Sequence, residues 1–297
     1  MLQIKSIASD VDLSPMNDLS KTLKIPRFMG ILNLTEDSFS DGALYLDPHD
    51  ALIHADKLIA EGAEIIDIGA ESTRPGAVPV PIETELERII PVLKAIKSRH
   101  PQICCSIDTR KAEVARRCID LGAEIINDIS ALSYDPEMMN LLRDHPQVKV
   151  ILMHMQGTPE TMQHNPHYTD VIQEIQMYFT ELISSCVKRG IQLKNIMIDP
   201  GIGFGKNLQH NLALLANLQA LYAPEVPIVL GASRKSFINE LHPSEPMQRL
   251  GGSLAATAWA IVKHVEIVRV HDVAAHLQFA KVFIAIAQEE MFASCLF

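Results

Sequence analysis

Two clusters of polar and glycine residues in the second half of the chain have the composition of a ligand-binding site. They are Asp199-Pro200-Gly201-Ile202-Gly203-Phe204-Gly205-Lys206 and Gly231-Ala232-Ser233-Arg234-Lys235-Ser236. Each follows a short apolar run, at 196–198 and 227–230, so its polar residues are expected at the end of a buried strand. Neither cluster has the spacing GxxxxGK[ST] or GxGxxG, which disfavours a nucleotide P-loop and a dinucleotide fold.

The same layout of apolar run, polar turn and helical pattern recurs along the chain. Short apolar runs lie at 27–33, 63–69, 103–107, 125–128, 148–153, 196–199, 227–231 and 265–271. Helical patterns lie at 48–61, 83–99, 111–121, 136–143, 169–188, 208–221, within 248–263 after a shorter element at 235–241, and at 273–287. Apolar strands that alternate with helices are typical of a parallel sheet. The sequence predicts an α/β fold, one closed (β/α)8 TIM barrel over 27–297 after a short N-terminal extension at 1–26, with an open doubly wound sheet as the alternative.

In such a barrel the active site lies at the carboxyl ends of the strands. The residues at these ends are Asn33, the segment 69–74, Asp108, Asn127, Met153, His154, Asp199, Lys235, Arg269 and His271. One mouth of the barrel is therefore expected to gather acids and amides opposite several cations.

Asp108, Asp199 and Asn127 are candidates for binding the edge of a ring. A carboxylate that accepts two parallel N–H bonds makes a strong contact, and a 2-amino-pyrimidinone ring offers such an edge. Lys235 is the other candidate partner, because a buried carboxylate needs compensation. For either aspartate alone, a cap on the following helix is slightly favoured. The pair together with Asn127 favours the ligand.

Arg269 and His271 point to one face of the last strand, because side chains alternate along a strand. On the inner face they suit a phosphate group, and the helix that begins near Asp272 adds positive potential. Arg74, between Thr73 and Pro75 in a stiff loop, is a further candidate for an anion contact. A structural ion pair of Arg269 with one of the aspartates is the less favoured alternative.

Magnesium is the cation that the sequence favours. The chain has 12 histidines, but it lacks an HExxH motif and few of the histidines fall at strand ends, so catalytic zinc is disfavoured. Mg²⁺ prefers oxygen ligands and is commonly held together with substrate phosphates. Asn33 and a substrate diphosphate are the expected ligands.

Composition limits the partners and the compartment. The formal net charge of -10 argues against general nucleic-acid binding. A count of five cysteines without CxxC spacing predicts free thiols and a cytoplasmic location. The acidic N-terminal segment is not a secretory signal, and the most apolar helix, 254–262, is too short to span a membrane.

Six motifs, in order, resemble the signature of the dihydropteroate synthase family. They lie at 29–42 (Met29-Gly30-Ile31-Leu32-Asn33 through Ser38-Phe39-Ser40-Asp41-Gly42), 71–76 (Glu71-Ser72-Thr73-Arg74-Pro75-Gly76), 106–109, 199–204, 233–236 and 269–273. The resemblance extends from about Phe28 to the C-terminus. Two residues of the first loop depart from the family pattern, Glu36 in place of proline and Ala43 in place of glycine.

The resemblance implies an enzyme that condenses 6-hydroxymethyl-7,8-dihydropterin diphosphate with p-aminobenzoate and releases pyrophosphate. It implies these roles: pterin binding by Asp108, Asn127, Asp199, Lys235 and Met153; diphosphate binding by Arg74, Arg269 and His271; magnesium binding by Asn33; and an aminobenzoate site framed by Phe39, Thr73, Pro75, Phe204 and Ser236. Asp41, with Arg74 and Lys235, is assigned to catalysis, where it closes the mouth or steadies a cation. A homodimer is the family expectation, with the last two helices as the candidate interface.

Two other functions remain as alternatives. A pterin-dependent methyltransferase barrel shares the pterin pocket, but it should lack the Ser-Phe-Ser-Asp and Ser-Thr-Arg-Pro loops that this chain has. A non-catalytic pterin- or anion-binding barrel should have lost Asn33, Arg74 or Lys235, and all three are present.

Overall fold

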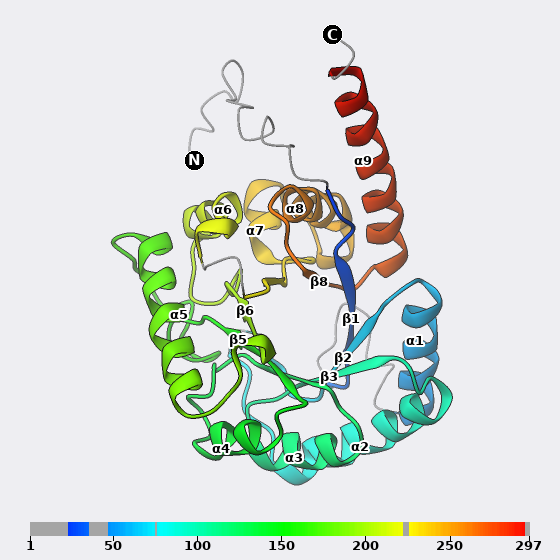
Figure 1. The fold of residues 1–297 in the computed structure, drawn as a ribbon, viewed down its shortest axis with the longest axis vertical. Coiled ribbons are helices and arrows are strands. Elements are labelled where there is room, and N and C mark those ends of the chain that lie inside the picture. The colour runs from blue at the N-terminus through cyan, green and yellow to red at the C-terminus, as the bar shows by residue number, and fades with distance from the viewer. Residues whose placement is uncertain (1–22, 36–46, 75, 222–225, 295–297) are drawn as a thin grey trace.

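A parallel sheet forms the centre of the protein (Figure 1). The structure, a computed structural model, describes residues 23–35, 47–74, 76–221 and 226–294, with 290–294 as backbone only. Its strands are β1 (Arg27–Asn33), β2 (Ile65–Gly69), β3 (Cys104–Asp108), β4 (Ile125–Asp128), β5 (Lys149–Met153), β6 (Ile196–Asp199), β7 (Val229–Leu230) and β8 (Ile267–Val270). They form an 8-stranded sheet in the order β6-β5-β4-β3-β2-β1-β8-β7.

The two edges of this sheet meet and close the barrel. Ile198 of β6 forms a parallel bridge with Ile228, just before β7, and the N–H of Ile198 donates to the carbonyl of Pro227 at 3.0 Å. Closure confirms the predicted (β/α)8 barrel and makes the open doubly wound alternative wrong. β7 is shorter than the predicted strand at 227–231, because Ile228 forms only an isolated bridge to Ile198 although its carbonyl also accepts from the N–H groups of Glu266 and Ile267.

Helices surround the barrel in the order that the sequence predicts (Figure 1). They are α1 (Pro48–Ala60), α2 (Ile82–Arg99), α3 (Ala112–Asp120), α4 (Glu137–Asp144), α5 (Val171–Lys188), α6 (Leu208–Ala216), α7 (Ser236–Leu241), α8 (Leu250–Val262) and α9 (Val273–Ser294), with 3-10 turns η2 (Leu193–Asn195), η3 (Leu218–Ala220) and η4 (Pro246–Gln248). Two differ clearly from the prediction. α9 continues beyond 287, and α6 ends before 221 because the Asn217 side chain donates to the carbonyl of Ala213 at 2.9 Å.

Local signals set the ends of the first helix. Asp47 caps α1, where its carboxylate accepts from the N–H of His49 at 2.8 Å. Gly62 follows the helix with φ +103°, and a Cβ there would lie 2.6 Å from the Leu277 side chain of α9. The chain can therefore turn sharply into β2 only with glycine at this position.

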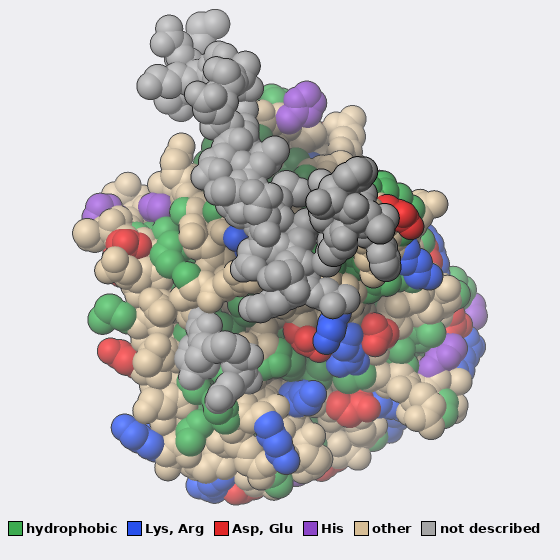
Figure 2. Space-filling model, turned by 45° about the horizontal axis from the view of Figure 1, so that its top comes forward, with side chains coloured by type: hydrophobic (Ala, Val, Ile, Leu, Met, Phe, Trp, Pro, Cys, Tyr) green, Lys and Arg blue, Asp and Glu red, His purple; other side chains and the backbone are tan. Residues whose placement is uncertain are grey.

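Apolar side chains fill two separate regions, one inside the barrel and one between the strands and the helices. The outer region includes Leu23, which is buried although it belongs to the predicted extension at 1–26. Among the described residues, every helix is too short or too polar to cross a membrane. On the face shown in Figure 2, acidic and basic side chains are interspersed.

Candidate active site

The inside of the barrel changes from apolar to polar toward the carboxyl ends of the strands. Its apolar floor consists of Met29, Ile65, Ile125, Ile151, Met197, Val229 and Ile267. Two positions further along each strand, where side chains again point inward, polar residues dominate. They are Asp67, Ser106, Asn127, Asp199 and Arg269.

Arg269 of β8 bridges two carboxylates on this polar level. Its Nε donates to Asp67 at 2.5 Å and its Nη2 donates to Asp108 at 3.0 Å. The ion pair with Asp108, which the sequence analysis disfavoured, therefore forms within the chain itself. Burial raises the pKa of Asp108, and the Arg269 charge only partly offsets this. Arg269 thus compensates Asp108, for which the sequence suggested Lys235 or a ligand as the partner, and also Asp67.

Neither predicted aspartate caps a helix. Asn207 caps α6. At the start of α3, the carboxylate of Asp135 accepts from the N–H of Ala112 at 2.8 Å. Asp199 accepts from the N–H of Gly201 at 2.7 Å, which shapes the turn after β6. Neither carboxylate is therefore occupied by the N-terminus of a helix, as the ligand hypothesis requires.

Lys235 lies at the entrance to this interior, on the ring of Phe204. Its Nζ is 4.1 Å from the ring centroid, a cation–π geometry. Burial, followed by the neighbouring Arg269 charge, lowers the pKa of Lys235 to about 8. The Lys235 charge also acts on Asp199, whose pKa is raised by burial and lowered in part by Gly201 and Lys235.

His271 acts here as a neutral side chain rather than as the cation that the sequence analysis expected. Burial and the charges of Arg234, Arg269 and Lys235 lower its pKa well below the usual value. The hydroxyl of Ser233 accepts from the N–H of His271 at 3.3 Å and lies 3.1 Å from Nδ1. If this hydroxyl donates to Nδ1, the ring proton is on Nε2, so His271 offers a hydrogen-bond donor to an anion.

These groups border one cavity of about 360 Å³. Predicted site residues that line it are Asn33, Thr73, Arg74, Asp108, Phe204, Lys235, Ser236, Arg269 and His271. Asn127 lies deeper, where its amide donates to Asp67 at 3.2 Å. Met153 packs with Ile129, Met162 and Phe204. Phe39, Asp41 and Pro75, with Glu36 and Ala43, lie outside the described residues.

Asp67 is the main site residue that the sequence analysis missed. It is fully buried, binds Arg269 and Asn127 through one oxygen, and its Oδ1 has no hydrogen-bond partner among the described residues. The signal was present in the sequence. Asp67 is the acid inside the apolar run 65–69, two residues before Gly69, and so shares the inward face of that strand.

Lys206 is a second missed residue, at the end of the glycine-rich turn. Its Nζ contacts His154 Nδ1 at 3.0 Å and the carbonyls of His154 and Phe204 at 3.2 and 2.9 Å. Burial lowers the pKa of Lys206 to about 7. Burial and the Lys206 charge lower the pKa of His154 to about 2, so this imidazole is neutral and its Nδ1 can accept from the Lys206 ammonium.

Comparison with known proteins gives consistent matches over nearly the whole chain. The sequence pattern of the family described as pterin binding enzymes matches residues 29–271. Dihydropteroate synthase of Escherichia coli K12 is 48% identical over 254 residues, which cover 86% of this chain and 89% of that protein.

Solved structures agree with this match. The Yersinia pestis dihydropteroate synthase, in complex with a sulfonamide drug, superposes with a TM-score of 0.85 at 42% identity, covering 91% of this chain and 96% of that one. The Burkholderia cenocepacia dihydropteroate synthase, complexed with 7,8-dihydropteroate, gives a TM-score of 0.81 at 38% identity, covering 90% and 94%.

Proposed function

Since the chain belongs to the pterin binding enzyme family, as a dihydropteroate synthase, we propose that its barrel cavity binds dihydropterin diphosphate and p-aminobenzoate at the residues described above. The chain is thus a transferase of folate biosynthesis. The observation that carries the assignment of residues is the convergence of distant motifs on one cavity at the carboxyl ends of the strands.

The pterin ring is proposed to lie in the polar interior, between Asp108, Asn127 and Asp199. The carboxylates supply acceptors for the N–H edge of the ring, and the Asn127 amide supplies both a donor and an acceptor. Lys235 lies at the entrance and provides a donor for the ring carbonyl. Met153, packed beside Phe204, gives the ring an apolar wall.

The diphosphate is proposed to lie at the mouth, against Arg74, Arg269 and His271. Arg74 and His271 line the cavity on the loops after β2 and β8. Arg269 can contact both the pterin ring and the diphosphate, because its guanidinium has five N–H donors and only some of them bind Asp67 and Asp108.

Mg²⁺ fits this mouth as a shared ion rather than as an ion in a protein cage. No group of three or more His, Cys, Asp or Glu side chains among the described residues is arranged to hold a metal. Asn33 borders the cavity, and an amide oxygen is a hard donor of the type that Mg²⁺ uses together with substrate phosphates and water. When bound, the ion supplies positive charge to the diphosphate.

The aminobenzoate is proposed to lie nearer the surface, between Phe204, Thr73 and Ser236, with Phe39 and Pro75 completing the site. Phe204 offers an aromatic face and Ser236 a hydroxyl at the start of α7. This placement leaves the amine directed inward, toward the carbon that carries the diphosphate.

The reaction is proposed to begin with cleavage of the C–O bond, whose electron pair leaves with the diphosphate. Arg74, Arg269 and the His271 donor stabilise the departing charge, and the dihydropterin ring stabilises the cation that remains. The neutral arylamine then forms the C–N bond and afterwards loses a proton. Asp41 is proposed to steady the cation or close the mouth.

A homodimer in the cytoplasm is proposed on two observations. Val282 and Ile286, one turn apart on α9, are 54% and 66% exposed. Exposed apolar side chains that lie together on a protein surface often mark an interface. Cys105, Cys118 and Cys186 are buried free thiols, which suits a reducing compartment.

Pyrophosphate release tests the function directly. The purified protein would be given dihydropterin diphosphate and Mg²⁺, with and without p-aminobenzoate. Release that depends on p-aminobenzoate and yields 7,8-dihydropteroate is expected. Tight pterin binding without turnover would instead support the binding-only alternative.

A further inference from the structure

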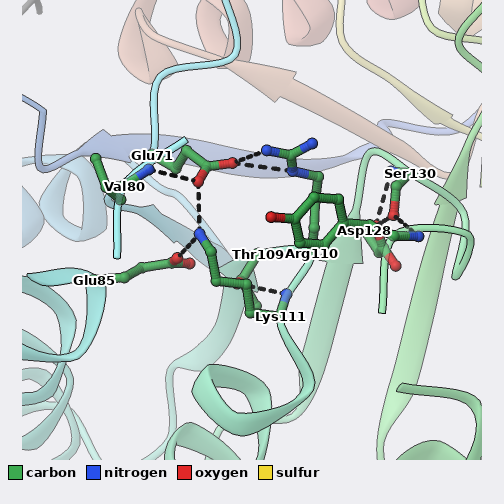
Figure 3. A network of polar contacts seen from close by, with 9 residues as sticks. Glu71, Val80, Glu85, Thr109, Arg110, Lys111, Asp128 and Ser130 are labelled. Carbon is green, nitrogen blue, oxygen red and sulfur yellow. Dashed lines mark hydrogen bonds and ion pairs between the residues drawn. The ribbon is translucent and has the colours of Figure 1, made fainter. Parts of the chain in front are cut away.

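Four buried charged side chains connect the loop after β2 with the loop after β3 (Figure 3). They are Glu71, Glu85, Arg110 and Lys111, here named the Glu71 network. One Glu71 oxygen accepts from Arg110 Nε at 3.0 Å and Nη2 at 2.5 Å, and the other accepts from Lys111 Nζ at 2.6 Å. Lys111 also donates to Glu85 at 2.5 Å. The four side chains are at most 8% exposed.

Glu71 and Lys111 each keep their charge through the other members of the Glu71 network. Burial would raise the pKa of Glu71, but Lys111 and Arg110 outweigh this effect and hold the pKa below its usual value. Burial would likewise lower the pKa of Lys111, but Glu71 and Glu85 raise it. At Glu85, in contrast, burial raises the pKa and Lys111 only partly offsets this. Two acids and two bases thus lie together, and removal of Glu71 leaves both bases without their shared partner.

Glu71 also joins the two ends of the loop that carries Thr73 and Arg74. The carboxylate stands at the start of this loop and accepts from the N–H of Val80, at its other end, at 3.1 Å. The bond spans nine positions and closes the base of segment 71–80. The conformation of Thr73 and Arg74 between these ends is therefore linked to the position of the Glu71 carboxylate.

The other side of the network is attached to the pterin end of the cavity. Arg110 and Lys111 come directly after Asp108 and Thr109, and the N–H of Thr109 donates to the carbonyl of Asn127 at 3.1 Å. The guanidinium of Arg110 lies 4.2 Å from the ring centroid of Tyr134, in the loop after β4. Glu71 is thus fixed to the segments that carry Asp108 and Asn127.

We propose that Glu71 is a positioning residue, which sets the aminobenzoate- and diphosphate-binding loop 71–80 at a defined distance from the pterin-binding residues through Arg110, Lys111 and Val80. The proposal rests on the proposed function. Stability alone is a weak explanation, because a buried ion cluster stabilises a fold little better than apolar residues of the same volume. The proposed role explains why the Glu71 carboxylate accepts both from Val80, at the end of the loop, and from Arg110 and Lys111, after β3.

Glu71→Gln is the test, with Glu85→Gln as the matched control. Both substitutions remove one buried carboxylate charge next to Lys111, but only Glu71 touches the loop. For Glu71→Gln we expect the KM for p-aminobenzoate to rise about tenfold or more, since small misplacements of a binding loop have large kinetic effects. The Kd for 6-hydroxymethyl-7,8-dihydropterin, which lacks the diphosphate that Arg74 would contact, should stay within about threefold, because Asp108, Asn127, Asp199 and Lys235 remain in place. Glu85→Gln should lower Tm without this change in KM.

Amide hydrogen exchange gives a readout that does not depend on turnover. In Glu71→Gln, segment 72–80 should exchange faster than in the unmodified protein, while strand β3 exchanges at the same rate. Should Glu71→Gln not fold, Val80→Pro removes the N–H donor to Glu71 and leaves all four charges, and the same rise in KM is expected. Equal effects of Glu71→Gln and Glu85→Gln, limited to Tm, would overturn the proposal. Absence of turnover in the unmodified protein would instead contradict the proposed function.

Discussion

At the scale of single residues, Asp67 and Arg269 determine how charge is arranged inside the barrel. Asp67 accepts from Arg269 and from Asn127 through the same oxygen, so it orients two residues that we assign to substrate binding. Arg269 also holds Asp108. A ligand that takes up the acceptors of Asp108 therefore competes with Arg269, whereas Asp67 keeps the guanidinium in the site.

Replacement of Asp67 by asparagine should weaken substrate binding. The variant leaves Arg269 with only Asp108 as a buried partner, so we expect a loss of ~3 kcal/mol in the free energy of unfolding. We expect the Kd for dihydropterin diphosphate, measured by calorimetry, to rise about tenfold or more, as for a lost hydrogen bond to a charged group. Ser106→Ala is the control, because the buried Ser106 hydroxyl makes no hydrogen bond among the described residues. Identical behaviour of the two variants would contradict the role of Asp67.

Lys235 should make pterin binding depend on pH. Its pKa is lowered to about 8 by burial and then by Arg269, and the protonated amine is the form that donates to the ligand and attracts the diphosphate. Affinity is therefore present below the pKa and is lost as pH rises through about 8, by about tenfold between pH 7 and pH 9. Calorimetric Kd values between about pH 7 and pH 9 measure this change. Lys235→Met should bind the ligand weakly at both ends of this pH range. If the Kd of that variant still rose between about pH 7 and pH 9, a group other than Lys235 would be responsible for the pH dependence.

At the scale of elements, the glycine-rich turn after β6 is packed against the turn after β5. Gly201 has φ +68°, and a Cβ there would lie 2.0 Å from the carbonyl oxygen of His154, so no other residue fits. Lys206 donates to that same carbonyl and to the carbonyl of Phe204. The two turns therefore form one unit that holds Asp199 and Phe204 at the proposed pterin site.

Lys206 should make this unit sensitive to pH through stability. Its pKa is about 7 in the folded protein, below the usual 10.5, because of burial. Between these values the unfolded chain binds more protons than the folded one, so this group makes the free energy of unfolding increase with pH. Urea unfolding across about pH 7 to pH 9 should show a steeper rise for the unmodified protein than for Lys206→Met. Parallel curves would contradict the lowered pKa.

At the scale of the whole molecule, α9 is the element whose exposed apolar side chains need an explanation. It lies outside the barrel on the side opposite α5 (Figure 1), and Phe279 and Phe283 stack on each other at 5.7 Å between ring centroids. Val282 and Ile286 face outward beside this pair. A second copy of the chain is the partner that the family expectation suggests for this surface.

Ile286→Glu should dissociate the proposed homodimer. A charge placed in an apolar interface is desolvated without a partner, which costs several kcal/mol. We expect analytical ultracentrifugation to show a dimer for the unmodified protein and a monomer for Ile286→Glu. Met177→Glu, on α5 at a similar exposure of 62%, should remain dimeric. A monomer in the unmodified protein would remove the basis of the proposal.

Most of the fold was predictable from the sequence because its signals are local. Apolar runs of strand length, Asp47 before α1 and Gly62 after it indicate where elements begin and end without reference to the rest of the chain. The motifs also placed Asn33, Asp108, Asp199, Lys235 and Arg269 at or just beyond strand ends. All of them except Asp199 line the same cavity. The exact lengths of β7 and α6 were less predictable, because they depend on the Ile198–Ile228 bridge and the Asn217 side chain.

The sequence by itself determined the barrel, the family resemblance and the set of polar residues at the strand ends, since periodicity and motif order are properties of the chain alone. Only the tertiary structure decided which of these residues pair. Arg269 meets Asp67 and Asp108 across a separation of 202 and 161 positions, and Lys111 meets Glu71 and Glu85 from another loop. Such pairs form only once the sheet has closed and brought side chains of distant strands and loops together. A buried charge is stable only beside a partner in space, and the order of residues in the chain does not show which partner that is.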